Sequence, residues 1–143
     1  MPASIRERIT AQLAVVCGGI GLATGGRVRE TATRREEGSY YSIEPENESV
    51  IAIGDYADQN QFDISIQIQT RGDVPDKIAD AIAVAMHSAI FTDPWLDSMC
   101  DRYRRIASNW AFSDADLTAG TLTVKYRFTY LCSVFDLTAR PPL

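Results

Sequence analysis

Histidine and cysteine are scarce in this chain, and their scarcity limits the chemistry that it can perform. The sequence contains one histidine, His87, and three cysteines, and no two cysteines form a Cys-x-x-Cys pair. Zinc sites and thiol–disulfide enzymes need such closely spaced ligands, so neither is predicted. We expect reduced and buried thiols at Cys17, Cys100 and Cys132.

Long apolar runs and an excess of positive charge are also missing. The most apolar stretch, residues 13–23, is too short and too rich in glycine to span a bilayer, and the charges from Arg6 onward predict no secretory signal. The chain has a net charge of −5, whereas proteins that bind nucleic acids or anionic membranes usually carry a surface of positive charge. No membrane partner and no sequence-specific nucleic-acid partner is therefore expected. The length and the 45% of hydrophobic residues suit a single domain spanning residues 1–143.

Catalytic and cofactor motifs are the third absence. The glycines within residues 18–26 follow a predicted helix, whereas a dinucleotide-binding loop follows a strand, so a flexible connection is predicted there. Asp93, Asp97 and Asp101 are four residues apart, but no calcium-binding loop surrounds them and a solvated face is favoured. His87 has no nucleophile or carboxylate in a local motif. No metal and no cofactor is expected.

Strict alternation of apolar and polar residues is the strongest pattern that is present. Residues 121–130 alternate without a break, and residues 62–69 do the same. Because successive side chains of a strand point to opposite faces, each segment predicts a strand with one buried and one solvated face. Two such strands predict a largely antiparallel sheet that is covered on one face. The predicted buried residues of the later strand are Leu122, Val124, Tyr126, Phe128 and Tyr130.

Helical patterns supply the predicted cover. Residues 4–16 begin with a capping box, Ser4 and Glu7, and carry apolar residues at helical spacing. Residues 75–90 begin with Pro75 at a first helical position and carry an apolar stripe through four turns. The opposite side of this long helix is also weakly polar, so we expect it to pack on the sheet and on a second element, the N-terminal helix or a neighbouring subunit. A short helix is predicted after Asp93 and Pro94.

The remaining segments complete an α+β fold, a mostly antiparallel sheet of about five to six strands with the long helix and the N-terminal helix packed on one face. Further strands are predicted at residues 27–34, 40–43, 49–56 and 102–112. Residues 113–120 are predicted to be a turn that joins the last two strands into a hairpin, and residues 136–143 a surface tail.

Charged residues gather in two places that are candidate contact surfaces. One is a predicted acidic turn, residues 44–49, with Glu44, Glu46 and Glu48. The other is an arginine cluster, whose members are Arg102, Arg104 and Arg105. We hypothesise that the two meet across a subunit boundary, although ordinary surface charge explains them equally well. The solvated face of the last strand adds Lys125 and Arg127 to these interface candidates.

The order of elements in the second half resembles a known family. An alternating strand precedes the long helix at residues 75–87, and the segment Asp93-Pro-Trp-Leu, an irregular strand and residues 114–130 follow. Residues 60–135 resemble the tail terminator (tail completion, or minor tail) proteins of long-tailed bacteriophages and prophages. The resemblance implies an α+β protein that assembles in the host cytoplasm into a ring, typically a hexamer, in the tail or neck of the virion. It carries over no catalytic residue, so no enzyme is expected.

The resemblance also implies the partners of such a ring. A tail tube protein would lie on one side and a head–tail connector on the other, and genome DNA would pass through the centre. Two alternatives stay open from the sequence. One is a head–tail connector, a neighbouring neck component of similar size. The other is a small ligand-binding domain or enzyme that uses His87 and nearby carboxylates.

Overall fold

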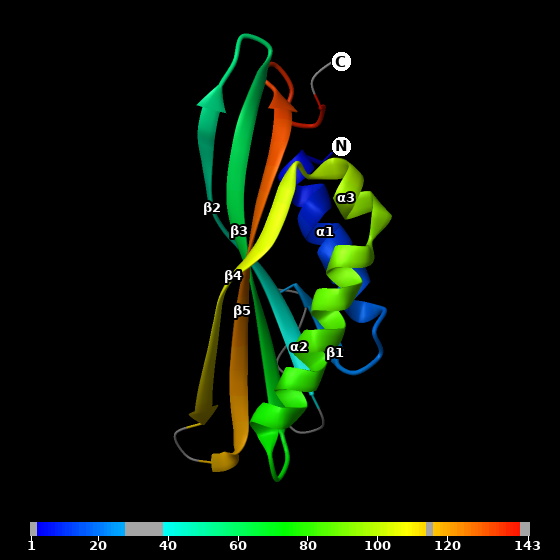
Figure 1. Ribbon diagram of the computed structural model, residues 1–143, viewed down its shortest axis with the longest axis vertical. Helices are drawn as coiled ribbons and strands as arrows, with labels where there is room; N and C mark the ends of the chain where they lie inside the picture. Colours follow the sequence, from blue (N-terminus) through cyan, green and yellow to red (C-terminus); the bar gives the residue numbers. More distant parts are fainter. Residues whose placement is uncertain (1–2, 28–38, 114–115, 141–143) are drawn as a thin grey trace.

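The chain forms one sheet with helices on a single face, as the computed structural model shows (Figure 1). Residues 3–27, 39–113 and 116–140 are described. The sheet has five strands in the order β1-β2-β3-β5-β4. The elements along the chain are α1 (Ile5–Gly18), β1 (Thr24–Arg27), β2 (Tyr40–Ile53), β3 (Ala57–Arg71), α2 (Pro75–Thr92), α3 (Pro94–Met99), β4 (Arg102–Ser113) and β5 (Asp116–Ser133). The predicted α+β class is confirmed.

The sheet is antiparallel except at one edge. β3 pairs antiparallel with β2 and β5, and β5 pairs antiparallel with β4. β1 alone is parallel to its neighbour, β2. The strands are long and the sheet twists strongly, so that its two ends are rotated relative to each other in Figure 1. The predicted hairpin of the last two strands, β4 and β5, is confirmed.

The alternation of β3 and β5 predicts their buried faces correctly, except that Leu122 is only half-buried. Phe62 lies opposite Phe128, Ile64 opposite Tyr126 and Ile66 opposite Val124, and these side chains are all buried. Burial of one such side chain stabilises the fold by roughly 1.5–3 kcal/mol relative to exposure. Matching register therefore places the two apolar faces side by side beneath the helices.

Helix α1 begins where its capping box predicts. Ser4 Oγ accepts a hydrogen bond of 3.1 Å from the backbone N–H of Glu7. Its buried stripe is Ile5, Ile9, Leu13 and Cys17. We expected Val16 in the last position, but one more residue of helix turns Cys17 toward the core and leaves Val16 only half-buried.

Helix α2 packs on the sheet and on α1, which explains why both of its sides are apolar. It contacts β3, β5 and α1. Ile82, Met86 and Ile90 are buried as predicted, whereas Ala81 is exposed and Ala79, which we expected on the outer side, is buried. The small Ala79 side chain allows the close approach of a neighbouring element. The N-terminal helix thus provides the second cover that the sequence left open.

An aromatic row runs from exposed rings on α2 into the buried face of the sheet. Ring centroids lie 4.5 Å apart for His87 and Phe91, 4.8 Å for Phe91 and Tyr103, and 5.7 Å for Tyr103 and Phe128. Phe128 continues the row to Phe62 at 5.7 Å. Stacked aromatic pairs add about 0.5–1.5 kcal/mol each beyond the area that they bury. The row joins α2 to β4 and β5, so it fixes the helix on the sheet.

The predicted acidic turn at residues 44–49 is wrong, because these residues lie within β2. The strand continues through Pro45, and its register with β3 shifts between Pro45 and Glu48. Proline lacks an N–H, but an edge strand with a bulge does not need every donor. The segments that we predicted as two strands, residues 40–43 and 49–56, are therefore one strand with an irregularity.

The glycine-rich connection after α1 is more ordered than predicted, because Thr24–Arg27 form β1. A Cβ atom on Gly25 would lie 1.9 Å from the backbone oxygen of Tyr41. Only glycine allows the two strands to approach this closely. The predicted edge strand at residues 27–34 lies outside the described residues except for Arg27.

The turn predicted at residues 113–120 is shorter than expected, since β5 already begins at Asp116. Residues 114 and 115 lie outside the described part. At the other end of β5, the C-terminal segment lies at the surface but is held in place. The backbone N–H of Ile5 donates a hydrogen bond of 3.0 Å to the carbonyl of Leu137, and Arg140 Nη2 lies 3.8 Å from Asp101 Oδ1. Sequence periodicity does not reveal such contacts.

Candidate assembly surfaces

The face of the sheet opposite the helices carries paired charges. Lys125 Nζ lies 3.0 Å from Glu46 Oε2, and Ser65 Oγ also donates to this carboxylate. Arg127 Nε donates to Asp63 Oδ1 at 2.9 Å, and a second bond of 3.2 Å joins Nη2 to Oδ2. The predicted interface residues Glu46, Lys125 and Arg127 thus already have partners within the chain.

These contacts change the ionisation of the groups involved. The hydrogen bonds from Ser65 and Lys125 lower the pKa of Glu46. The hydrogen bond to Asp63 raises the pKa of Arg127. The Glu46 carboxylate and the Arg127 guanidinium are therefore charged at neutral pH. Since all of these side chains are partly exposed, each pair contributes about 1 kcal/mol or less.

The arginine cluster is divided between the two faces of the sheet. Arg102 lies opposite Thr129 and Arg104 opposite Arg127, which places both on the helix-free face. Arg105 lies opposite Tyr126, on the helix face. Among the described residues, no carboxylate forms an ion pair with Arg102 or Arg104. The cluster that we predicted as a unit therefore offers two different surfaces.

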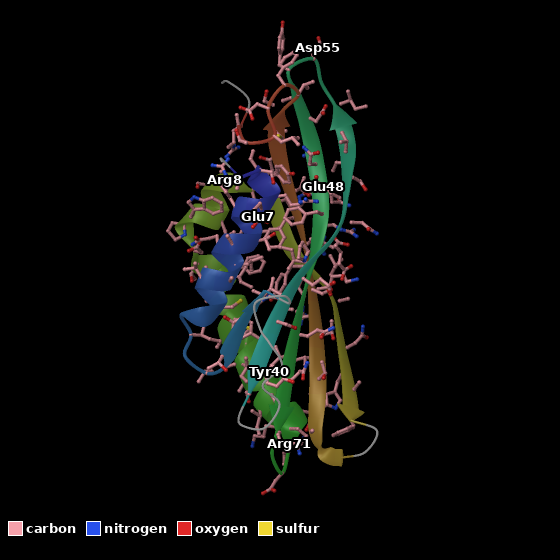
Figure 2. The ribbon with its side chains drawn as sticks, turned by 180° about the vertical axis from the view of Figure 1, so that it is seen from behind. Glu7, Arg8, Tyr40, Glu48, Asp55 and Arg71 are labelled. Atoms are coloured by element: carbon pink, nitrogen blue, oxygen red, sulfur yellow. The ribbon has the colours of Figure 1, made fainter. Side chains whose placement is uncertain are left out.

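The glutamates divide in the same way. Glu44 lies opposite Ser65 on the helix-free face, where Glu46 also points. Glu48 lies opposite the buried Phe62 and accepts a hydrogen bond of 2.5 Å from Tyr130 Oη. Burial raises the pKa of Tyr130, and the bond to Glu48 raises it further. Figure 2 shows Glu48 and Asp55 toward one end of the sheet and Tyr40 and Arg71 toward the other.

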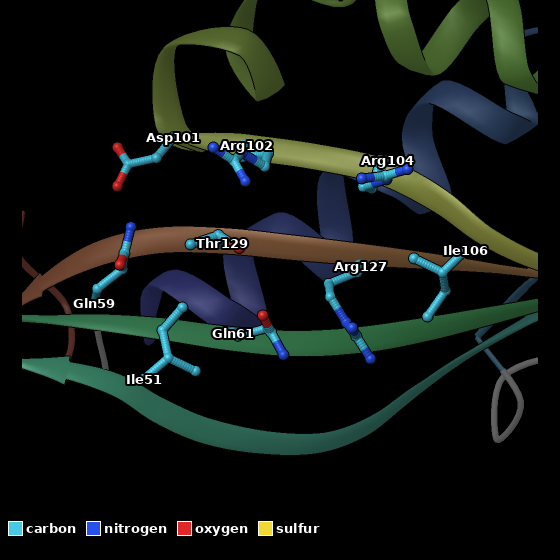
Figure 3. A pocket seen from close by; sticks show the side chains of 9 residues that line it. All are labelled: Ile51, Gln59, Gln61, Asp101, Arg102, Arg104, Ile106, Arg127 and Thr129. Carbon is cyan, nitrogen blue, oxygen red and sulfur yellow. The ribbon is translucent and has the colours of Figure 1, made fainter.

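A shallow groove crosses the helix-free face (Figure 3). It has a volume of about 520 Å³. Ile51 and Ile106 provide apolar surface at its two sides, and Arg102, Arg104 and Arg127 provide positive charge. Like charges that face each other across strands are unfavourable. Since Arg127 is already paired with Asp63, Arg104 is the neighbour that is suited to an external negative charge.

A second groove of about 540 Å³ lies between α2 and the strands β4 and β5. His87 and Tyr126 line it, with His87 Nδ1 and Tyr126 Oη 2.8 Å apart. Burial raises the pKa of Tyr126 to about 12, so the phenol stays protonated at neutral pH. Asp80 and Ser88 line the same groove. His87 stacks in the aromatic row and bonds to a tyrosine, an arrangement that a structural histidine also adopts.

Metal and thiol chemistry find no support in the described part of the chain. No group of three or more His, Cys, Asp or Glu side chains there is placed to hold a metal ion. All three cysteines are buried and free, as predicted, and burial raises the pKa of Cys17 and of Cys100 to about 12. Among the described helices, none has the length and apolar character needed to cross a bilayer.

Exposed apolar side chains near the β2–β3 hairpin are a feature that sequence reasoning missed. Ile53 is 87% exposed, Tyr56 69% and Phe135 79%. For Ile53 and Tyr56 the signal is present as apolar residues around the turn at Gly54 and Asp55, but the sequence pattern predicts only a strand at residues 49–56 with turn residues at its end. Exposed apolar side chains at one end of a molecule are typical of a surface that another protein covers.

Comparison with known proteins defines the fold. No protein-family model matches the chain, and no curated protein matches its sequence. Among solved structures, a chain from a structure described as the virion of a native gene transfer agent (GTA) particle aligns with a TM-score of 0.53 and 16% sequence identity. The alignment covers 90% of this chain and 92% of that chain. The chain therefore shares its fold, over almost its whole length, with a protein of that particle.

Proposed function

We propose that the chain is a structural protein of a phage-like virion. The observation that carries this proposal is the shared fold with the gene transfer agent chain, which covers 90% of one chain and 92% of the other. High coverage of both chains favours a corresponding role over a chance likeness of a part. The resemblance of residues 60–135 to tail terminator proteins points to the same class of particle.

Within the virion, the proposed role is that of a tail terminator. The chain would close into a ring, typically a hexamer in the family that it resembles, on the head-proximal end of the tail tube. There it would end tube growth and offer a surface for head joining. Its partners would be the tail tube protein on one side and the head–tail connector on the other, with genome DNA passing through. No catalytic step is required of the chain in this role.

The surfaces described above support an assembly role. The helix-free face carries the groove with Arg102 and Arg104, and one end of the molecule exposes Ile53 and Phe135. Ring closure requires a contact between two different surfaces of the same chain. The residues proposed for subunit or partner contacts are Glu44, Glu46, Glu48, Arg102, Arg104, Arg105, Lys125 and Arg127.

Deletion of the gene in the strain that produces the particles tests the proposal, with tails examined by negative-stain electron microscopy. A terminator predicts overlong tails without heads, and normal tails when the gene is supplied from a plasmid. Tails of normal length that fail to join heads would assign the chain to the head–tail connector instead. Particles of normal form and number would contradict both virion roles and leave a ligand-binding or enzymatic role at His87 to be tested.

A further inference from the structure

In the described part of the chain, the sheet has two open edges, and each belongs to a different strand. β4 is the outer strand on one side, and within the described chain no strand pairs with it on the side away from β5. On the other side, β1 pairs only with Tyr40–Ile43 of β2. Among the described residues, the segment 44–53 of β2 therefore has a partner in β3 but none on its outer side. Open edges present unpaired backbone groups that can bind another strand.

The directions of these two edges are complementary. Three successive antiparallel pairings separate β2 from β4, so the two strands run in opposite directions within one chain. A second copy placed beside β4 without being turned over would therefore present its β2 antiparallel to β4. Its helix-free face would continue the helix-free face of the first copy. This is the relation between neighbouring subunits of a ring, in which two unlike surfaces meet.

The charges of the two edges are also complementary at the same level of the sheet. The register aligns Ala107 with Lys125, Ser65 and Glu44 in one row. It aligns Arg104 with Arg127 and Asp63, and Asp63 faces the irregular part of β2 between Pro45 and Glu48. In a neighbouring copy at the same height, Glu44 would lie opposite Ala107 and diagonal to Arg104, a separation that the long arginine side chain can span. This contact would give Arg104 the negative partner that its position opposite Arg127 lacks.

The same charges disfavour pairing between like edges. Two β4 strands that pair with each other would bring Arg102 and Arg104 of both copies together, and two β2 strands would bring Glu44 of both copies together. Like charges on opposing strands are destabilising. Charges on edge strands commonly prevent such unwanted pairing. Here they exclude the two symmetric arrangements and leave the unlike pair, β4 with β2.

We infer that copies of this chain join edge to edge, with residues 102–107 of β4 of one copy pairing antiparallel with residues 44–49 of β2 of the next. One sheet would then run through successive subunits, with Glu44 and Arg104 paired across each boundary. This inference deepens the proposed ring by naming the contact that closes it, and it rests on the self-association proposed there.

Cysteine cross-linking of the purified chain tests this contact. Asn47 and Ala107 are exposed, uncharged residues of the two edges, and Gln67 is an exposed, uncharged residue of the interior strand β3. Each is changed singly to cysteine. The native cysteines are all buried, which keeps the background low. A mixture of Asn47→Cys and Ala107→Cys should give covalent dimers with a short bis-maleimide reagent at high protein concentration, and neither variant alone should do so.

The control mixtures define what would overturn the inference. Gln67→Cys mixed with either edge variant should give no dimers, because the interior strand does not reach a neighbouring copy. Dimers within a single edge variant would indicate a symmetric contact, and dimers with Gln67→Cys would indicate packing of sheet faces. Either result, or the absence of dimers from the edge mixture at millimolar chain, would overturn the edge-to-edge contact.

Charge reversal supplies a second measurement that does not depend on the position of the reagent. Arg104→Glu in the Ala107→Cys chain should lower the cross-linking yield about fivefold, since one attractive pair becomes repulsive. Glu44→Arg in the Asn47→Cys chain should then restore the yield when the two are mixed. Loss without restoration would count against the Glu44–Arg104 pair.

The two proposals can fail separately. A wild-type chain that restores normal tails in the deletion strain but gives no edge cross-links would overturn this contact and leave the proposed function intact. Edge cross-links from a chain whose deletion leaves particles unchanged would retain the contact and overturn the proposed function.

Discussion

Single residues determine where this fold tolerates no change, and Gly25 is the clearest case. A Cβ atom there would collide with the backbone of Tyr41, which cannot move without separating β1 from β2. We predict that Gly25→Ala lowers the free energy of unfolding by about 1–3 kcal/mol, the usual cost of forced overpacking. Urea denaturation measures the change. The matched control is Gly19→Ala, whose Cβ would meet its neighbours at no less than 3.5 Å; an equal loss there would contradict the explanation.

Glu46 is a second single residue whose contribution to the stability of the fold depends on pH. Its pKa is lowered in the folded chain, so its stabilising contribution is present above the ordinary value of 4.5 and is lost as the pH falls through the lowered value. We predict that Glu46→Gln has less stability than the wild type at pH 7 by about 1 kcal/mol or less, because the carboxylate is partly exposed. The difference should shrink in urea titrations at about pH 3. A difference that persists there would show that charge is not its cause.

The division of charged residues between faces was only partly accessible from the sequence, and their partners were not. Alternation along a strand separates Arg104 from Arg105. It would place Glu46 and Glu48 on one face, and the register shift between Pro45 and Glu48 is what separates them. The pair of Glu46 and Lys125 depends instead on register across two neighbouring strands. Register between strands distant in sequence is set by tertiary packing, which local periodicity does not report.

Among the elements, β5 pairs with β3 and β4 and carries the middle of the aromatic row. We predict that Phe128→Ala lowers the free energy of unfolding by about 3–5 kcal/mol, since Phe128 is fully buried between Phe62 and Tyr103. Thermal or urea unfolding followed by circular dichroism measures the loss. Phe135→Ala, at a phenylalanine that is 79% exposed, should change stability by less than about 0.5 kcal/mol.

Helices and strands with a strong apolar periodicity were predicted well. Strands that form only because of the strand beside them were not. The alternation of β3 and β5 and the apolar stripes of α1 and α2 are properties of the segments themselves. β1 contains two glycines among its four residues and has no strand-forming pattern of its own. It is a strand only because Gly25 fits against Tyr41. β2 contains Pro45, which is compatible with a strand only at an edge beside a bulge.

At the scale of the whole molecule, Arg104 and Arg105 lie on opposite faces of the sheet, so the two faces can be tested separately by mutation. We predict that Arg104→Glu reduces ring formation, as measured by native mass spectrometry of the assembled protein, and reduces the number of joined particles. Arg105→Glu should have a smaller effect on the edge contact, because Arg105 points to the helix side. The Arg104→Glu, Arg105→Glu double variant should assemble poorly. Normal rings and normal tails from the double variant would contradict the assembly role of these residues.

The hydrogen bond between Ile5 and Leu137 brings the first helix and the last described segment together at one pole of the molecule (Figure 1). A bulky label fused to either terminus should therefore mark the same pole, and micrographs of labelled particles would show which way each subunit points along the tail. The same closeness makes the chain a candidate for circular permutation, with a short linker joining the old ends and new ends opened at Gly54. In such a permutant, both new ends would emerge beside the exposed Ile53 and Tyr56, where they would obstruct any partner of that surface.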